Sequence, residues 1–243
     1  MTVPVWPGLG LSAAGALVVW ATGQGTPRGA VAGFLVSALV VTGLGVGAFA
    51  PLAVFVLGAG ALTRLGRSRK EHRGLEEPNR GRRSVAHVGA KLALPALCGA
   101  LGLAGVGPRD AVSLVFVAAV CGAFADTAGT EVGPLGGGNV LVLENWRPAA
   151  RPHGAPGGVS AAGLIASGLA AAAVAAAAWA AGVLPSGRAA AAAAAGLAGS
   201  LAESVLARTT LGERAGHHGR NGAVSVVSAA GALLARALGW VRA

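Results

Sequence analysis

The chain has 243 residues, of which 54% are hydrophobic and only 12% are charged. A typical soluble domain carries about 25% charged residues, so this composition excludes an ordinary soluble protein and indicates an integral membrane protein. The net charge of +10 does not indicate a partner made of nucleic acid, because the basic residues gather between apolar segments, as membrane topology requires.

Apolar segments of nearly the length that a helix needs to cross a bilayer, about 20 residues, follow one another along the chain. They are 8–22, 28–46, 48–65, 84–105, 109–128, 157–183, 188–207 and 221–241. Each is continuously apolar and does not alternate with polar residues, so the segments predict helices and not the strands of a membrane barrel. We expect an all-α, polytopic bundle of about seven or eight transmembrane helices, forming one integral membrane domain over residues 1–243.

The basic residues favour one orientation of this bundle. Lys and Arg are enriched in the cytoplasmic loops of membrane proteins, and here they gather in residues 64–84, 134–156 and 208–220. With eight crossings, these loops fall on one side, which we assign to the cytoplasm. We expect a multi-pass protein of the cell membrane, in contact with lipid, whose site faces the cytoplasm. This interpretation is compatible with a homo-oligomer.

The fifth apolar segment ends in acidic and hydroxyl side chains. The sequence ADTAGTEVG over 125–133 places Asp126, Thr127, Thr130 and Glu131 there, and acidic side chains at membrane depth are costly and usually functional. On a continuous helix Asp126 and Thr130 share a face, whereas Glu131 points away. The glycines and the proline that follow predict fraying that lets Glu131 turn back. These oxygen groups suit Mg²⁺; the alternative is a helix end whose acids simply reach water.

A second candidate precedes the sixth segment, in the sequence RPHGAPGGVSAAG over 151–163. The start of a helix is a ready site for anions. Gly157 and Gly158 permit close approach, Ser160 is a possible donor, and Arg151 adds positive charge together with the neighbouring histidine. The alternative is an ordinary glycine-rich helix cap.

The longest basic loop ends in Arg82 and Arg83, shortly before Lys91 in the fourth segment. Arginine suits bidentate contacts with phosphate, so these three cations are candidates for neutralising a polyphosphate. Two simpler interpretations stay open. The loop is also explained by topology and attraction to anionic lipid, and Lys91 by extension of its ammonium to the membrane interface.

Two further polar residues lie near the expected cytoplasmic face. Glu203, at the end of the seventh segment, is either a metal ligand or the structural partner of an arginine. Asn221 is either a substrate-binding residue or the N-cap of the last helix. The adjacent His217 and His218 lack a third ligand at useful spacing, so they do not indicate a metal site.

Four motifs in a fixed order carry a resemblance to a known family. They are GRRSVAHV (81–88), ADTAGTEVG (125–133), GAPGGVSAAG (154–163) and NGAVSVVSAAGALLA (221–235). From about residue 28 onward, the chain resembles the membrane-protein family typified by transmembrane protein 19, which includes the phytyl-phosphate kinase of tocopherol synthesis.

The resemblance implies phosphoryl transfer from a nucleoside triphosphate, with CTP favoured, to an isoprenoid monophosphate such as phytyl or geranylgeranyl phosphate. The acceptor oxygen is already ionised at pH 7, so catalysis reduces to alignment and charge neutralisation. The expected catalytic residues are Asp126, Glu131 and Lys91, and the expected ligands of Mg²⁺ are Asp126, Glu131 and Glu203. The expected nucleotide- and substrate-binding residues are Arg82, Arg83, Thr127, Thr130, Arg151, Gly157, Gly158, Ser160 and Asn221.

Two other classes of function stay open. Acids within the membrane and broken helices also mark secondary transporters and lipid-phosphate translocases, although a transport site needs access from both sides. Asp110 is the only acidic residue expected in the outer half of the bundle, and this favours the enzyme over the transporter. A structural or assembly protein is the third alternative, for which neutralising Asp126 would change nothing measurable.

Overall fold

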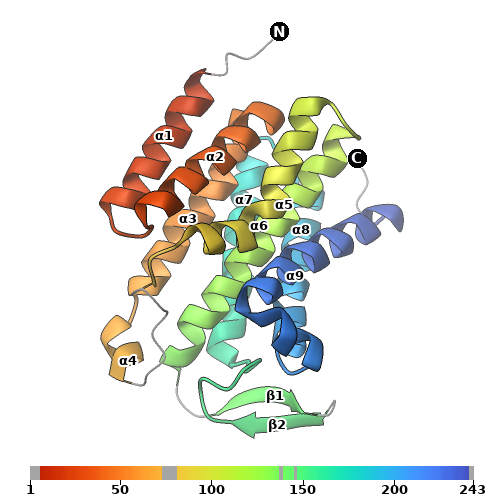
Figure 1. Ribbon diagram of the computed structural model, residues 1–243. Helices are drawn as coiled ribbons and strands as arrows, with labels where there is room; N and C mark the ends of the chain where they lie inside the picture. Colours follow the sequence, from red (N-terminus) through yellow and green to blue (C-terminus); the bar gives the residue numbers. More distant parts are fainter. Residues whose placement is uncertain (1–5, 73–80, 137–138, 145–146, 241–243) are drawn as a thin grey trace.

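The computed structural model describes residues 6–72, 81–136, 139–144 and 147–240, and the expectation of a helical membrane bundle is confirmed (Figure 1). Its helices and strands are α1 (Trp6–Ala21), α2 (Pro27–Leu44), η1 (Val46–Ala48), α3 (Phe49–Arg64), α4 (Arg67–His72), α5 (Val85–Ala104), α6 (Arg109–Val132), η3 (Gly133–Leu135), β1 (Val140–Glu144), β2 (Arg147–Arg151), α7 (Ala161–Ala180), α8 (Ser186–Leu206) and α9 (Thr210–Ala237).

Six helices in the described part of the chain are long and apolar enough to cross a membrane, by length and composition. They are α2, α3 (extended by η1), α5, α6 (extended by η3), α7 and α8. The first and last of the expected crossings fall outside this set. Helix α1 has only 16 residues, and α9 has Glu213, Arg214 and Arg220 in its first half.

Helix α6 runs through the middle of the bundle and packs against α3, α5, α7, α8 and α9 (Figure 1). Within an 18-residue stretch of α6, 89% of the residues are buried inside the molecule, whereas in the other spans 22–39% of the residues are buried. The side chains of Leu114, Phe116 and Val117 have no exposed surface. Because protein surrounds α6, the acids at its end meet other helices and not lipid.

Glycine allows the closest helix crossing in the first half of the bundle. A Cβ atom on Gly43 of α2 would lie 1.9 Å from the carbonyl oxygen of Gly99 on α5. Small residues permit such backbone approach between membrane helices. This contact brings α5, which carries Lys91, against α2.

Three helix ends differ from the expected ones. Helix α6 continues unbroken to Val132, so the predicted fraying after Asp126 is wrong. Helix α7 begins only at Ala161, with Ser160 as its N-cap. The last helix begins at Thr210, is capped by Thr209 and bends at Gly216 (φ 63°, ψ −175°), so Asn221 is not an N-cap.

The loop 134–156 contains a β-hairpin, which the sequence did not predict. Strands β1 and β2 pair antiparallel, with a register that runs from Val140↔Arg151 to Glu144↔Arg147. A bridge between Leu141 and Val159 joins the hairpin to the segment before α7. The hairpin therefore lies at one end of the bundle, across the start of α7 (Figure 1).

Candidate functional site

A polar cavity of about 250 Å³ lies at the hairpin end of the bundle. Residues from α6, from the segment before α7, from α8 and from α9 line it. Seven of the candidate residues are among them, namely Asp126, Thr130, Gly157, Gly158, Ser160, Glu203 and Asn221. Parts of the chain that are almost 100 residues apart in sequence thus meet in one site.

The two adjacent glycines are required where the loop enters this cavity. Gly157 has φ +70°, and a Cβ atom there would lie 2.2 Å from the carbonyl oxygen of Ser204 on α8. A Cβ atom on Gly158 would lie 2.5 Å from Val140 Cγ2 of the hairpin. The close approach that glycine permits is therefore to α8 and β1, and it places the start of α7 beside the cavity.

Ser160 ties the start of α7 to the end of α6. Its hydroxyl accepts a hydrogen bond from the Gly163 N–H (3.0 Å) and donates one to the carbonyl oxygen of Gly133 (3.4 Å). The helix-cap interpretation of Ser160 is thus confirmed, and its proposed contact with substrate stays a prediction.

Asp126 is held by a cation from the neighbouring helix. Lys91 Nζ on α5 donates hydrogen bonds to Asp126 Oδ2 (2.7 Å) and to Thr127 Oγ1 (2.8 Å). The side chains of Lys91 and Asp126 are only 12% and 11% exposed. The ammonium of Lys91 therefore turns into the bundle, and the interpretation that it extends to the membrane interface is wrong.

Glu203 has a similar arrangement on the opposite wall of the polar cavity. Arg220 Nε on α9 donates to Glu203 Oε1 at 2.8 Å, and the two side chains are 19% and 17% exposed. A second hydrogen bond joins Arg220 Nη1 to the carbonyl oxygen of Gly212 (3.2 Å). The pairing of Glu203 with an arginine is confirmed, and the polar cavity still has Glu203 in its lining.

Glu131 faces a different part of the molecule. On the unbroken α6, it lies about 140° around the helix axis from Asp126. Thr63 Oγ1 on α3 donates to Glu131 Oε1, and Arg83 Nη2 lies 3.6 Å from the same oxygen. Of the three expected Mg²⁺ ligands, Asp126 and Glu203 line the polar cavity and Glu131 does not, so Glu131 faces other surroundings and its role as a ligand stays a prediction.

The three candidate arginines are also dispersed. The backbone N–H of Arg83 donates to Gln24 and its carbonyl oxygen accepts from Thr26, while its side chain donates to Thr63 Oγ1 (3.1 Å). Arg82 Nη2 donates to the carbonyl oxygen of Gly25 (3.5 Å). Arg151 is an exposed residue of β2. Arg82 and Arg151 line neither this cavity nor the one described next.

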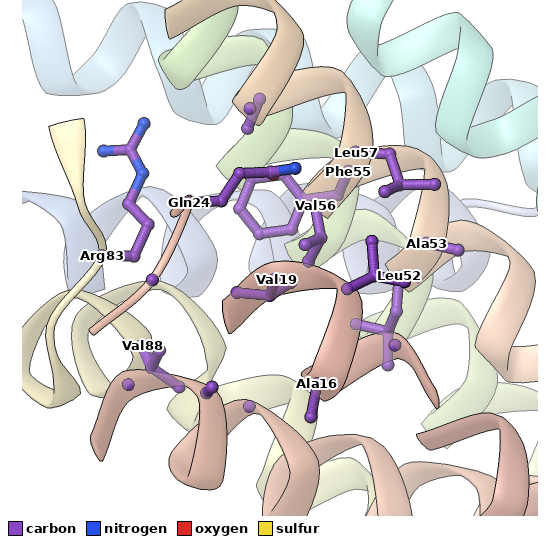
Figure 2. A pocket seen from close by; sticks show the side chains of 18 of the residues that line it. Ala16, Val19, Gln24, Leu52, Ala53, Phe55, Val56, Leu57, Arg83 and Val88 are labelled. Atoms are coloured by element: carbon purple, nitrogen blue, oxygen red, sulfur yellow. The ribbon is translucent and has the colours of Figure 1, made fainter. Parts of the chain in front are cut away.

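An apolar cavity of about 450 Å³ lies between α1, α2, α3 and α5 (Figure 2). Aliphatic and aromatic side chains such as Val19, Leu52 and Phe55 form most of its wall. Its lining becomes polar at one end, where Thr63, Arg83, His87, Lys91 and Thr127 lie. No sequence signal located this cavity, because helices from separate segments must pack before it exists.

The two cavities adjoin at the ion pair between α5 and α6. Lys91 and Thr127 line the apolar cavity, Asp126 lines the polar cavity, and the hydrogen bonds described above connect them. Occupants of the apolar cavity and of the polar cavity would therefore lie on opposite sides of the Lys91–Asp126 pair.

The donor set of the polar cavity fits Mg²⁺ only together with substrate oxygens. Its wall offers the carboxylates of Asp126 and Glu203, the Thr130 hydroxyl and the Asn221 amide. Among the described residues, no group of three or more His, Cys, Asp or Glu side chains is placed to hold a metal ion. Mg²⁺ commonly binds one or two carboxylates and completes its shell with phosphate oxygens and water.

One buried atom in the polar cavity lining has no partner. His153 Nε2 is buried and, within the described residues, makes no hydrogen bond, although buried polar atoms are normally satisfied. A polar ligand in the cavity would supply a hydrogen-bond partner for this nitrogen.

Comparisons with known proteins agree with a membrane location. The sequence profile of the family described as integral membrane protein DUF92 matches residues 10–217. An uncharacterized membrane protein of Synechocystis sp. is 35% identical over 115 residues. That match covers 46% of this chain and 43% of the relative, so it spans less than half of either protein. No solved structure matches the chain.

Proposed function

The chain belongs to the DUF92 family of integral membrane proteins, and we propose that it is a membrane kinase that phosphorylates an isoprenoid monophosphate. The phosphoryl donor is a nucleoside triphosphate, with CTP favoured on the sequence resemblance alone. One observation carries the proposal: an apolar cavity and a polar cavity meet at a buried lysine–aspartate pair. A reaction between a lipid and a nucleotide needs such a junction.

The apolar cavity suits the lipid substrate. Its volume of about 450 Å³ falls within the range of about 300–1,000 Å³ that is typical of ligand sites. The hydrocarbon chain would lie against α1, α2 and α3. Arg83 and Lys91, at the polar end of the lining, would then contact the phosphate, for which both cations are suited.

The polar cavity suits the phosphates of the nucleotide. It contains the start of α7, where free N–H groups and the helix dipole favour anions. Arg220 also lines it and would add positive charge, and His153, whose buried Nε2 has no partner among the described residues, would gain one. Asp126 and Glu203, two of the three expected ligands, would hold Mg²⁺ together with phosphate oxygens. When bound, Mg²⁺ would neutralise negative charge on the phosphates.

The residues at the junction would align the two substrates. An oxygen of the lipid monophosphate would attack the terminal phosphorus of the nucleotide, and the bond from that phosphorus to the bridging oxygen would break. The products are a lipid diphosphate and a nucleoside diphosphate. No proton needs to be removed from the ionised acceptor, so Lys91 would act by neutralising charge between the two phosphates.

A direct assay tests the proposal. Purified protein in detergent is given labelled CTP or ATP, Mg²⁺, and phytyl, geranyl or geranylgeranyl monophosphate. We expect a labelled diphosphate in the wild type and in Asp110→Asn. Asp110 lies at the other end of α6 from Asp126, where it pairs with Arg188 of α8 and Arg236 of α9. We expect none in Asp126→Asn. Absence of product with every donor and acceptor would contradict the proposal.

The transporter alternative is less well supported. Transport sites at the middle of the membrane are typically formed by discontinuous helices, whereas α6 is regular from Arg109 to Val132. Movement of labelled lipid phosphate across vesicles that contain the protein, without nucleotide, would favour the transporter.

A further inference from the structure

We infer that Gly33, in the middle of α2, sets the length of the hydrocarbon chain that the apolar cavity accepts. The inference concerns the lipid substrate of the proposed function, and its test measures binding and not turnover. Lipid binding and kinase activity can therefore fail separately.

The apolar cavity is elongated along the bundle. On α3, its lining extends from Phe49 to Arg64, and at 1.5 Å per residue this distance is about 22 Å. The hydrocarbon core of a bilayer is about 30 Å thick. The cavity is therefore long enough for one extended chain over most of that depth. Figure 2 shows Arg83 and Gln24 on the left of the view and Leu52 and Ala53 on the right.

The polar end of the cavity fixes which way such a chain would lie. Arg83 and Lys91 line that end, while Ser12, Gly15 and Phe49 line the opposite end. Lys91 and Arg83 each lie beside a carboxylate, Asp126 and Glu131. Arg64 and Arg67 also line the cavity, and no carboxylate lines it in the described part of the chain, so charge complementarity selects an anionic head group at this end. The occupant that fits this polarity is a lipid with one hydrocarbon chain and a phosphate head group.

Gly33 lies halfway along the part of α2 that lines the cavity, which runs from Gly29 to Ser37. A Cβ atom on Gly29 would lie 2.2 Å from the carbonyl oxygen of Arg83, so packing requires glycine there. A Cβ atom on Gly33 would have no neighbour within 4 Å. Packing therefore does not explain Gly33, although glycine inside a helix costs about 0.5–1 kcal/mol relative to alanine.

The consequence of this glycine is space within the cavity. A larger side chain at position 33 would project into the cavity. Along the axis of α2, it would lie about 6 Å from Gly29 and about 6 Å from Ser37, the two limits of the α2 lining. It would leave the end beside Arg83 and Lys91 open and would obstruct the far half. The absence of a side chain at Gly33 thus keeps the two halves continuous.

The far end is closed by neighbouring side chains. A Cβ atom on Gly15 would lie 3.3 Å from Phe49 Cζ, and the hydroxyl oxygens of Ser12 and Ser37 lie 2.8 Å apart between α1 and α2. Phe49 is therefore the side chain whose removal would extend the cavity. A substitution of Phe49 should lengthen the cavity, whereas a substitution of Gly33 should shorten it, so the two variants test the inference in opposite directions.

The experiment compares the variant Gly33→Leu with Gly10→Leu. Gly10 is an exposed glycine of α1 with no neighbour within 4 Å of its Cβ position and no place in the cavity lining. Leucine is favoured over glycine in helices, so both variants are expected to fold. Binding of geranyl, farnesyl and geranylgeranyl monophosphate to the detergent-solubilised protein is measured by displacement of a fluorescent prenyl phosphate.

In the wild type and in Gly10→Leu, we expect affinity to rise with chain length. In Gly33→Leu, we expect geranylgeranyl phosphate to bind at least about 100-fold more weakly, because the carbons that would lie in the far half of the cavity lose their burial. Geranyl phosphate should bind within about twofold of its wild-type affinity, since the end of the cavity beside the cations is unchanged. The variant Phe49→Ala should shift the preference toward chains longer than geranylgeranyl.

Two results would overturn the inference. One is an equal effect of Gly33→Leu on all three chain lengths, or no effect on any. The other is equally tight binding of two-chain phosphatidic acid, or of the prenols that lack phosphate. If binding depends on chain length as expected while no diphosphate forms with any nucleotide, the inference stands and the proposed kinase activity is wrong.

Discussion

Lys91 on α5 and Asp126 on α6 form a buried ion pair, 2.7 Å from Nζ to Oδ2, where the polar and apolar cavities meet. Removing one partner of such a pair leaves a buried charge without compensation, whereas replacing both with apolar residues is often neutral for stability. A comparison of single and double substitutions therefore separates the role of the Lys91–Asp126 pair in function from its role in stability.

The first prediction follows from that pair. Asp126→Asn should abolish diphosphate formation and lower the stability of the protein by about 3–5 kcal/mol, because Lys91 stays buried without its partner. The double variant Lys91→Met/Asp126→Leu should recover most of the stability and none of the activity. Thermal unfolding in detergent and the labelled-nucleotide assay measure the two effects. Recovery of activity in the double variant would show that the pair is only structural.

The second prediction concerns Glu131, which contacts Thr63 and lies beside Arg83. Because these partners line the polar end of the apolar cavity, Glu131 is positioned to orient Arg83 toward a lipid phosphate. Glu131→Gln should raise the KM for the lipid monophosphate about tenfold, and Thr63→Val should do the same. The Mg²⁺ concentration needed for half-maximal rate should not change.

A changed Mg²⁺ requirement in Glu131→Gln would restore the original expectation that Glu131 is a metal ligand. An unchanged KM for the lipid would instead show that Arg83 needs no carboxylate partner. Each outcome is read from initial rates as one substrate is varied at a time.

The helical membrane fold was predictable because continuous apolar segments are a property of local sequence. The identity of seven polar-cavity residues was also predictable. Acids are rare in this chain, and Asp126 and Glu203 both line the cavity. The course of α6 was not predictable. Glycine and proline near its end favoured a break, yet α6 packs along α7 and stays regular to Val132.

What the sequence did not contain was the pairing between distant segments. Glu131 meets Thr63 and Arg83 across three separate parts of the chain. The tandem histidines of α9 gain a third imidazole from α5, because the ring centroids of His87 and His218 lie 5.0 Å apart. No spacing in the sequence reports such contacts, since they depend on how the helices pack.

The third prediction concerns the turn before α7. In Gly157→Ala, the new Cβ would collide with the carbonyl oxygen of Ser204 in a backbone with φ +70°. We expect a loss of about 1–3 kcal/mol in stability from the strained backbone, and a larger loss of nucleotide affinity than of lipid affinity. Gly168→Ala is the control, because a Cβ atom there has no neighbour within 4 Å. Equal effects of the two substitutions on nucleotide binding would mean that the turn does not shape the polar cavity.

The last prediction tests whether Glu203 is, with Asp126, the second carboxylate that binds Mg²⁺. Glu203→Gln keeps the shape of the side chain and its acceptor for Arg220, so the polar cavity should persist. The Mg²⁺ concentration for half-maximal rate should rise at least about tenfold, because a neutral amide oxygen is a weaker ligand for a hard cation than a carboxylate is. Glu213→Gln, on the exposed face of α9, should leave the requirement unchanged. If Glu203 only holds Arg220 in place, its substitution should lower stability and weaken nucleotide binding equally at every Mg²⁺ concentration. The dependence on Mg²⁺, and not the loss of rate itself, therefore decides between the two roles.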